Sequence, residues 1–229
     1  MMSHRSRNLV IIGVSSNFDL VELACEIRES DGSHRYSIAG FLDDDPRKQG
    51  QFFRGHPVLG VIDSANGCPG DFFFVNAIGN VKGVASRDRI VERAGVPEER
   101  FATLVHPRAH VSASSRLGPG AVVLAGATIG SDAQLDGFCD VMHNAIVSHG
   151  CSIGKFAFLA AGAALGGGVV VGECTFIGLN ASVREGVRIG KRAIVGQGAV
   201  VIHDVPDNTT VAGSPARIIH PTRTHDEAT

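Results

Sequence analysis

Tryptophan is absent from this sequence of 229 residues and only one tyrosine is present, so large amphipathic aromatic side chains contribute little to its core. The sequence also has no excess of charge of one sign. Its 21 lysines and arginines nearly balance its 23 aspartates and glutamates, for a formal net charge of −2. Nucleic acids and anionic membrane surfaces are bound by basic patches, so this balance argues against both kinds of partner.

Long hydrophobic runs are missing as well. The apolar run over residues 9–14 is interrupted by Gly13 and is far shorter than the roughly 20 residues that span a bilayer. We interpret it as a buried strand and not as a signal peptide. The five cysteines are an odd number and form neither a CxxC pair nor a close cluster with histidines. A secreted disulfide framework and a zinc finger are therefore poor fits, and we expect a cytoplasmic protein that binds no metal.

A six-residue repeat fills the second half of the sequence. From Val111 to Val201 an aliphatic residue recurs at every sixth position, over sixteen hexads. A small or β-branched residue follows each of them four positions later, from Ser115 to Val205. This period fits neither an α-helix nor an ordinary strand, but it suits a short strand followed by a tight corner. Three such units close a triangular coil of 18 residues, and stacked coils form an all-β parallel β-helix.

The narrow interior of such a coil holds one aliphatic and one small residue on each side, so both recurring positions must face inward. Cys139 and Cys151 occupy the small inward position. We interpret them as inert packing thiols rather than as nucleophiles.

The first hundred residues alternate between strand and helix patterns. We expect strands over 8–13, 36–42, 72–78 and 101–104, and helices over 17–30 and 84–94. This βαβ alternation predicts an α/β domain with a small parallel, Rossmann-like sheet and helices on its faces. Ligands of such sheets bind beyond the carboxyl ends of the strands.

The hexads and the segment VAGSPAR at 211–217 resemble the hexapeptide-repeat acyltransferases over residues 105–219. The β-helix of that family is left-handed, a hand that the period alone does not set. The resemblance implies acetyl-CoA as co-substrate and a homotrimer with its active sites between neighbouring β-helices. The segment is similar to the family's loop at the nucleotide end of coenzyme A, where Arg217 can pair with phosphate. The implied coenzyme contacts are Gly167, Gly213, Pro215, Ala216 and Arg217.

Three segments at the expected carboxyl ends of strands resemble the N-terminal domain of nucleotide-sugar and sialic acid acetyltransferases. They are GVSSN at 13–17, GFLDDDP at 40–46 and AIGN at 77–80. The first departs from the family's G-x-G-G-H-G, so Asn17 could instead serve only as a helix N-cap, and the acidic run could be a solvated turn. The resemblance implies contacts to a nucleotide sugar from Gly13, Ser15, Ser16, Asp43, Asp44, Gly79 and Asn80.

Residues 18 apart lie above one another in the coils, which places Gly167 one coil above His149. An imidazole beside backbone that carries no side chain offers both a general base and an N–H group for an oxyanion. The family's motif E-H-[DE]-C is similar to SHGC at 148–151 and implies that His149 is the catalytic histidine. The alternative is an ordinary surface histidine.

Gly150 replaces the acidic residue that orients the imidazole in the family, and Phe158 replaces a second histidine. Asp132 lies one coil below Gly150, and we expect its carboxylate to take over the orienting role. We interpret His143 as an exposed polar corner. His203 shares the column of His149 but lies three coils away, about 14 Å, which is too far to share a metal ion.

Two pairs of phenylalanines 18 residues apart are expected to form exposed apolar ridges, and such ridges typically mark an interface. They are Phe138 with Phe156, and Phe158 with Phe176. With the resemblance, they favour a cyclic homotrimer. The alternative is that the N-terminal domain covers them.

The sequence is therefore interpreted as a nucleotide-sugar-binding domain over 1–104, a β-helix over 105–213 and a coenzyme-contacting loop and tail over 214–229. The expected activity is acetyl-CoA-dependent N-acetylation of a nucleotide-linked amino sugar, such as a UDP- or GDP-4-amino-4,6-dideoxyhexose, in bacterial surface-glycan synthesis. The missing acidic partner favours an amine, which is already nucleophilic. The alternatives are a sugar or sialic acid O-acetyltransferase and a catalytically weakened nucleotide-sugar-binding scaffold.

Overall fold

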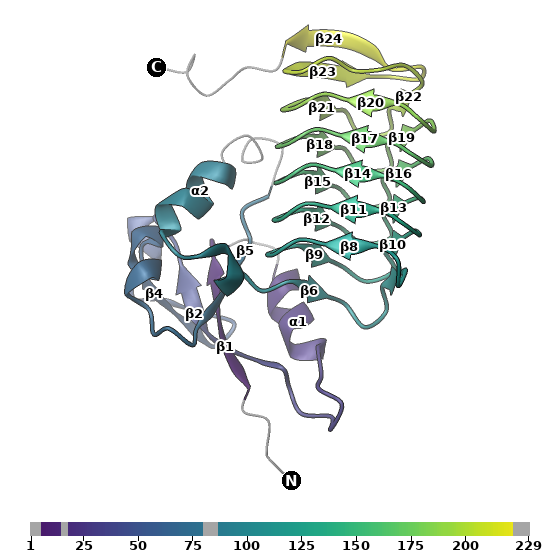
Figure 1. Ribbon diagram of the computed structural model, residues 1–229. Coiled ribbons are helices and arrows are strands. Elements are labelled where there is room, and N and C mark those ends of the chain that lie inside the picture. Colours follow the sequence, from purple (N-terminus) through teal and green to yellow (C-terminus); the bar gives the residue numbers. More distant parts are fainter. Residues whose placement is uncertain (1–5, 15–17, 80–86, 222–229) are drawn as a thin grey trace.

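The computed structural model describes residues 6–14, 18–79 and 87–221. Figure 1 shows a small α/β unit, in purple and blue, beside a stack of short strands, in green and yellow. The N-terminal unit lies against the first coils of the stack, and the last coils project beyond it.

The N-terminal unit is a five-stranded sheet with the order β3-β4-β2-β1-β5. Strands β1, β2, β4 and β5 are parallel, whereas β3 pairs with β4 in an antiparallel hairpin. The strand order reverses at β1, because β2 lies on one side of it and β5 on the other. The bounds are β1 (Arg7–Ile12), α1 (Asp19–Glu26), β2 (Tyr36–Leu42), β3 (Phe52–Phe53), β4 (His56–Gly60), β5 (Phe73–Asn76) and α2 (Arg87–Ala94), with 3-10 turns at Pro46–Lys48, Ile62–Gly67 and Glu98–Arg100.

The sequence located most of these elements but not all of them. The strand expected over 36–42 is confirmed, and β1 is shifted by one residue from the strand expected over 8–13. β5 is shorter than the strand expected over 72–78, and α1 ends before residue 30. The described part of the helix expected over 84–94 is α2, which ends at Ala94 as expected. The hairpin of β3 and β4 was missed, because β3 has only two residues and because Pro57 and Gly60 are unfavourable within a strand such as β4. The strand expected over 101–104 is wrong: Phe101 forms only an isolated bridge with Phe74. Leu104 and Val105 form β6, which belongs to the stack of coils.

The rest of the chain is a parallel β-helix with three sheets. Every pairing between its two-residue strands joins residues 18 positions apart, which confirms the predicted coil; Ile129 with Val147 is one example. The β6 sheet contains β6 (Leu104–Val105), β9 (Val122–Val123), β12 (Asp140–Val141), β15 (Phe158–Leu159), β18 (Phe176–Ile177), β21 (Ile194–Val195), β23 (Thr209–Ala212) and β24 (Arg217–Pro221). The β7 sheet contains β7 (His110–Val111), β10 (Thr128–Ile129), β13 (Ile146–Val147), β16 (Ala164–Leu165), β19 (Ser182–Val183) and β22 (Val200–Val201). The β8 sheet contains β8 (Arg116–Leu117), β11 (Gln134–Leu135), β14 (Ser152–Ile153), β17 (Val170–Val171) and β20 (Arg188–Ile189).

The two recurring positions of the hexads form the core of the β-helix, as predicted. From Val123 to Val201 the aliphatic residues are buried, and Cys139 and Cys151 lie among the small residues that alternate with them. The regular offset ends in the last coil, where Ile194 pairs with Thr210 and β24 folds back antiparallel to β23. No helix in the described part of the chain is long and apolar enough to cross a bilayer.

The phenylalanine ridges are buried within one chain, which corrects the expectation that they are exposed. Phe138 stacks on Phe156 and Phe158 on Phe176, with ring centroids 4.9 and 5.3 Å apart. All four side chains are at most 8% exposed. Phe101 packs edge-on against Phe138, so the N-terminal half of the chain covers that ridge, as the alternative interpretation had it. These ridges therefore do not supply an interface between subunits.

Candidate active site

His149 lies at the corner between β13 and β14, and its side chain is exposed. Its ring lies directly against Gly167: a Cβ added to that glycine would come within 2.5 Å of Cε1 and 2.6 Å of Nε2. The register of the two coils is held by the Gly168 N–H, which donates to the carbonyl oxygen of His149 at 2.9 Å. The predicted contact between coils is therefore present, and a side chain at position 167 would displace the imidazole from this place.

The Gly167 N–H donates no hydrogen bond to any residue that the structure describes. Its carbonyl oxygen, in contrast, accepts a hydrogen bond from Gly186 at 2.9 Å. In acyl transfer, an imidazole can take the proton of the attacking group, and a free N–H group beside it can stabilise the oxyanion of the tetrahedral intermediate.

The imidazole of His149 makes no hydrogen bond or ion pair within the described part of the chain. Asp132 is exposed at the corner of the coil below, with its N–H donating to Ser114 Oγ at 3.0 Å. Its orienting role therefore stays a prediction. Gly150 has φ of +64°, a backbone conformation that favours glycine. The position of a Cβ there is open space, so crowding does not explain the glycine.

The acidic segment after β2 shapes the loops at this edge of the sheet. Asp43 is buried, and its carboxylate accepts hydrogen bonds from the Val14 and Asp45 N–H groups at 2.7 and 2.9 Å and from Lys48 Nζ at 2.8 Å. Lys48 Nζ also donates to the Val14 carbonyl oxygen at 3.0 Å. The sequence did not single out Lys48, whose cationic group thus lies at the turn that follows β1.

Asp44 also has partners within the chain. Its carboxylate accepts from the Ile62 N–H at 3.1 Å and from Arg93 Nη1 at 2.8 Å. Arg93 also contacts Asp63 and thereby lowers the pKa of that carboxyl group. Asp43 and Asp44 therefore fix local loop geometry, and contact with a nucleoside stays a prediction for both.

Two of the predicted binding glycines permit close approach of chain segments. Gly13 has φ of +92°, and a Cβ there would come within 2.5 Å of Ile78 Cγ1. A Cβ on Gly79 would come within 2.7 Å of Phe158 Cε2. The predicted contacts of Ser15, Ser16 and Asn80 lie outside the described residues, as does the proposed cap at Asn17.

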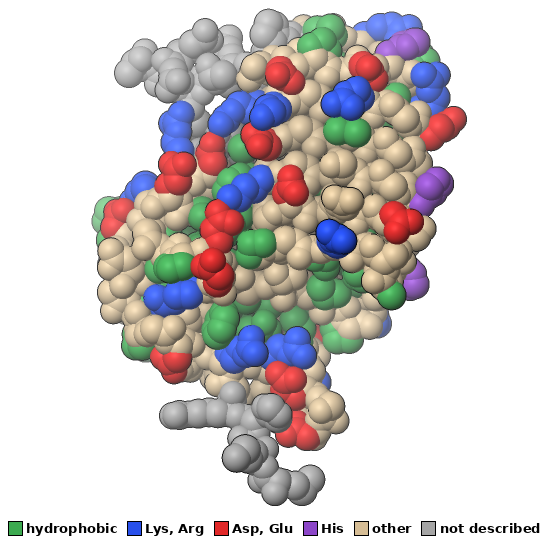
Figure 2. All heavy atoms as spheres, viewed as in Figure 1, with side chains coloured by type: hydrophobic (Ala, Val, Ile, Leu, Met, Phe, Trp, Pro, Cys, Tyr) green, Lys and Arg blue, Asp and Glu red, His purple; other side chains and the backbone are tan. Residues whose placement is uncertain are grey.

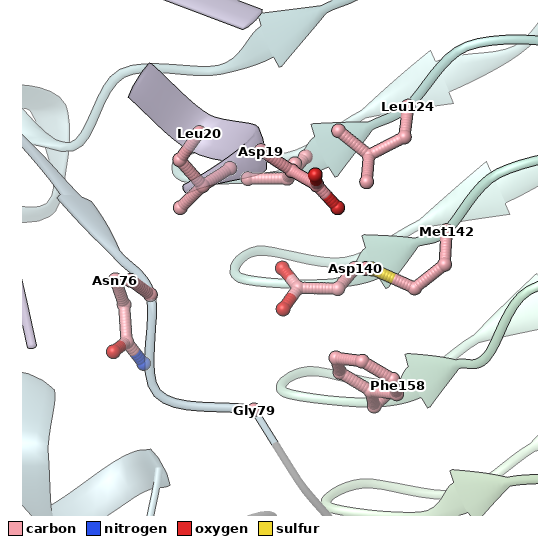
Figure 3. A pocket seen from close by; sticks show the side chains of 10 residues that line it. Asp19, Leu20, Asn76, Gly79, Leu124, Asp140, Met142 and Phe158 are labelled. Carbon is pink, nitrogen blue, oxygen red and sulfur yellow. The ribbon is translucent and has the colours of Figure 1, made fainter. Parts of the chain in front are cut away.

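The sequence missed a pocket of about 120 Å³ between the N-terminal unit and the β6 sheet. Figure 3 shows it between the end of β5, the start of α1 and the edges of β9, β12 and β15, with the Asp140 side chain projecting toward Asn76. It lies beside the switch point between β1 and β5, where open parallel sheets bind ligands. Its lining consists of Asp19, Leu20, Asn76, Ala77, Gly79, Val122, Leu124, Asp140, Met142 and Phe158.

Asp140 forms a buried ion pair with Arg87, with Oδ2 and Nη2 2.9 Å apart. Burial raises the pKa of Asp140, and the Arg87 guanidinium opposes that rise. Among the described residues, four buried atoms here have no hydrogen-bond partner: Asp140 Oδ1, Arg87 Nε and Nη1, and Asn76 Nδ2. One signal could have found Asp140, because its outward column of Val122, Asp140, Phe158, Phe176 and Ile194 is otherwise apolar.

The predicted coenzyme loop lies between β23 and β24, at the far end of the β-helix. The Ala216 N–H donates to the Val200 carbonyl oxygen at 2.8 Å, which fixes the loop on the β7 sheet. Arg217 is exposed, and its Nη1 donates to the carbonyl oxygen of Ala216. Gly213 and Pro215 are also exposed.

Clusters of metal-ligating side chains and patches of one charge sign are the surface features that indicate metal and nucleic-acid sites. No group of three or more His, Cys, Asp or Glu side chains among the described residues could hold a metal ion. Figure 2 shows basic and acidic side chains interspersed over the visible face, without a patch of one sign.

Solved structures similar to this chain include an acetyltransferase domain and a sugar N-acetyltransferase. The acetyltransferase domain of PglB from Neisseria gonorrhoeae, determined with acetyl coenzyme A, is 33% identical with a TM-score of 0.80, covering 94% of this chain and 100% of that one. A histidine-to-asparagine mutant of perosamine N-acetyltransferase from Caulobacter crescentus, determined with CoA and GDP-perosamine, is 32% identical with a TM-score of 0.79, covering 93% and 97%. WeeI from Acinetobacter baumannii is 25% identical with a TM-score of 0.76, covering 92% and 99%. No protein-family model matches the sequence, and a search of curated proteins finds no relative.

At this identity over nearly the whole of both chains, the protein belongs to the family of acetyl-CoA-dependent sugar N-acetyltransferases. It is therefore an acyltransferase, as the sequence predicted.

Proposed function

We propose that the protein transfers the acetyl group of acetyl-CoA to the amine of a nucleotide-linked amino sugar, such as a UDP- or GDP-4-amino-4,6-dideoxyhexose. The observation that carries this proposal is the contact between the His149 imidazole and Gly167. The similar Caulobacter enzyme is described with CoA and GDP-perosamine, also in variants in which one histidine is replaced. The proposed setting is the synthesis of bacterial surface glycans in the cytoplasm.

In the proposed reaction the sugar amine attacks the thioester carbonyl carbon. A C–N bond forms, the C–S bond breaks, and the oxyanion accepts a hydrogen bond from the free Gly167 N–H. His149 takes the proton that the amine loses and passes it to the departing CoA thiolate. A positioned base contributes about 10²–10⁴-fold to such a step, and a backbone donor to an oxyanion about 10²–10³-fold.

We propose Asp132 as the carboxylate that orients His149 when both substrates are bound. It stands in for the acidic residue that Gly150 replaces. Unchanged turnover of an Asp132→Asn variant at all pH values would reject this role.

The N-terminal unit is proposed as a Rossmann-like domain that binds the nucleotide at the carboxyl ends of its strands. Gly13, Ser15 and Ser16 would approach the pyrophosphate, and Lys48 supplies a positive charge at the same turn. Asp43, Asp44, Gly79 and Asn80 are the further proposed contacts. The loop with Gly213, Pro215, Ala216 and Arg217 is proposed to hold the nucleotide end of coenzyme A, with no metal involved.

We further propose a left-handed β-helix that assembles as a homotrimer with active sites between neighbouring copies. The outward residues of the β7 sheet above its first strand support the assembly, because they are uncharged and partly apolar. This face borders the corner of His149. These residues are Thr128, Ile146, Ala164, Ser182 and Val200, of which Ile146 and Val200 are 44% and 37% exposed, and His110 precedes them on the first strand.

A thiol-release assay with acetyl-CoA and a panel of nucleotide sugars tests the activity. Turnover of amino sugars, abolished in a His149→Ala variant that still binds both substrates, supports the proposal. Turnover of hydroxyl acceptors alone would identify an O-acetyltransferase. Binding of nucleotide sugars without turnover would identify a scaffold.

A further inference from the structure

The pocket beneath Gly79 contains polar atoms that the fold leaves without partners. Within the part of the chain that the structure describes, Asp140 Oδ1 has no hydrogen-bond donor and Asn76 Nδ2 has no acceptor, although these side chains are only 6% and 4% exposed. An unpaired buried polar atom costs about 1–3 kcal/mol. Both side chains line the same small space, so one ligand can satisfy both atoms.

The charges around the pocket indicate which part of a nucleotide sugar it fits. Asp19 and Asp140 line it, and no lysine or arginine is among its described lining residues. The Arg87 guanidinium, which pairs with Asp140 Oδ2 at 2.9 Å, balances one of these two negative charges. A pyrophosphate is therefore disfavoured here, whereas it is favoured at Lys48 on the turn after β1. A protonated or neutral amine suits a site with two carboxylates.

The remaining walls of the pocket are apolar. Leu20, Leu124, Met142 and Phe158 face the same space as the carboxylate of Asp140. Such a wall suits a deoxygenated carbon or a methyl group better than a hydroxyl group. A 4-amino-6-deoxy sugar combines these two properties, because it carries an amine on one carbon and a methyl group on a neighbouring part of the ring.

We propose that this pocket holds the amino-sugar ring of the substrate. Asp140 accepts a hydrogen bond from the sugar amine through Oδ1, and Asn76 donates through Nδ2 to an adjacent oxygen of the ring. Arg87 is a positioning residue that holds Asp140 through Oδ2. This inference rests on the proposed function and names the specificity-determining residues of the same reaction.

The position of the pocket requires a second copy of the chain. Asp140 projects from the outer face of the β6 sheet, whereas His149 lies at the corner where the β7 and β8 sheets meet. In a three-sided coil that corner is opposite the β6 sheet, with the hydrophobic interior between them. A sugar in this pocket therefore meets the imidazole of a neighbouring copy and not that of its own chain.

The experiment measures binding with two variants and a matched control. Asn76→Asp keeps the Oδ1 that accepts from the Ile78 N–H at 2.9 Å, and it turns the free donor into a charged acceptor that repels the ring oxygen Nδ2 is proposed to bind. Asp140→Asn removes the carboxylate at nearly constant size. Asp136→Asn makes the same chemical change at an exposed position of the same coil, outside the pocket. Thermal unfolding and CoA binding verify that each variant is folded.

The probes are UDP- and GDP-linked 4-amino-4,6-dideoxyhexoses, their 4-hydroxy counterparts, and UDP and GDP alone. For both pocket variants we expect at least a tenfold loss of affinity for the amino-sugar nucleotide and less than a twofold change for the nucleoside diphosphate. Asp140→Asn also reduces the preference for amine over hydroxyl. An equal loss for the nucleoside diphosphate would assign the pocket to the nucleotide and overturn the proposal, and so would unchanged affinities.

Complementation tests the role of the neighbouring copy. Mixed oligomers of His149→Ala and Asn76→Asp chains should regain turnover, because a pocket from the first chain meets an imidazole from the second. If verified mixed oligomers gain no turnover, the pocket proposal is overturned. The proposed function still holds in that case if the unaltered protein acetylates the amino sugar. An unaltered protein that neither binds nor acetylates any amino-sugar nucleotide would reject the proposed function itself.

Discussion

The imidazole of His149 and the α-carbon of Gly167 are in direct contact across two coils, with no room for a Cβ on the glycine. Gly167 has no positive φ, so alanine is compatible with its backbone. We expect Gly167→Ala to displace the exposed imidazole and to lower kcat by about 10²–10⁴-fold, the contribution of a positioned base. Steady-state kinetics of thiol release measure this loss.

The melting temperature should stay nearly unchanged, because the collision involves a surface side chain that is free to move. Gly70→Ala is the matched control, since a Cβ there meets nothing within 4 Å. A Gly167→Ala enzyme with the kcat of the parent would show that the position of this imidazole is irrelevant to the reaction.

The buried ion pair of Arg87 and Asp140 is expected to matter for stability. Arg87→Ala leaves the carboxylate of Asp140 buried without its partner, and breaking such a pair costs about 3–5 kcal/mol. Urea unfolding at neutral pH measures the loss. Lys191→Ala, which removes an exposed pair with Glu173, should cost about 0–1 kcal/mol. Equal effects of the two substitutions would contradict this assignment.

The β-helix could be predicted closely because one periodic constraint determines it. Each hexad places an aliphatic residue such as Ile129 and a small residue such as Ala133 inside the same narrow coil. The offset of 18 then predicts strand register and places His149 beside Gly167. The period breaks only where β24 closes the end of the coil, and no repeat signals that change.

The contact between the N-terminal unit and the β-helix could not be predicted in this way. The six-residue period predicts that the phenylalanine ridges face outward from the coils. The period does not predict which part of the chain covers them. Gly79 packs on Phe158, and Arg87 reaches Asp140 from a helix more than fifty residues earlier in the chain. Local patterns do not encode such distant contacts, so the pocket and Lys48 were missed while the corner with His149 was found.

The cysteines of the β-helix should be inert toward alkylation. Burial raises the pKa of Cys174 to about 11, and it raises the pKa of Cys139 and Cys151 as well. A raised pKa lowers the fraction of reactive thiolate at pH 8. We expect iodoacetamide to modify exposed Cys25 first and the three buried thiols only after unfolding. Peptide mass spectrometry measures the order, and rapid labelling of Cys139 in the native protein would contradict the packing.

Lys48 should contribute to nucleotide binding through its charge. Lys48→Met removes the cation at the turn after β1 and frees the Asp43 carboxylate that it contacts. We expect about a tenfold loss of affinity for UDP or GDP, and a weaker dependence of binding on salt concentration. Titration calorimetry at two ionic strengths measures both. Asn76→Asp is the contrasting variant, because it should leave nucleoside diphosphate binding nearly unchanged.

The outward face of the β7 sheet should be the surface through which copies associate. Ile146 projects from the middle of this face and is 44% exposed in a single chain. Ile146→Arg places a charge where burial in an interface would leave it unpaired, which costs several kcal/mol. We therefore expect the variant to be a folded monomer by light scattering.

Because the proposed site combines the Asp140 pocket of one copy with the His149 of another, the Ile146→Arg monomer should bind the nucleotide sugar yet lose nearly all turnover. Gln134→Arg introduces the same charge on an exposed position of the β8 sheet and should leave assembly intact. A fully active Ile146→Arg monomer would show that one chain contains the whole site. An Ile146→Arg trimer would place the interface on another face of the prism.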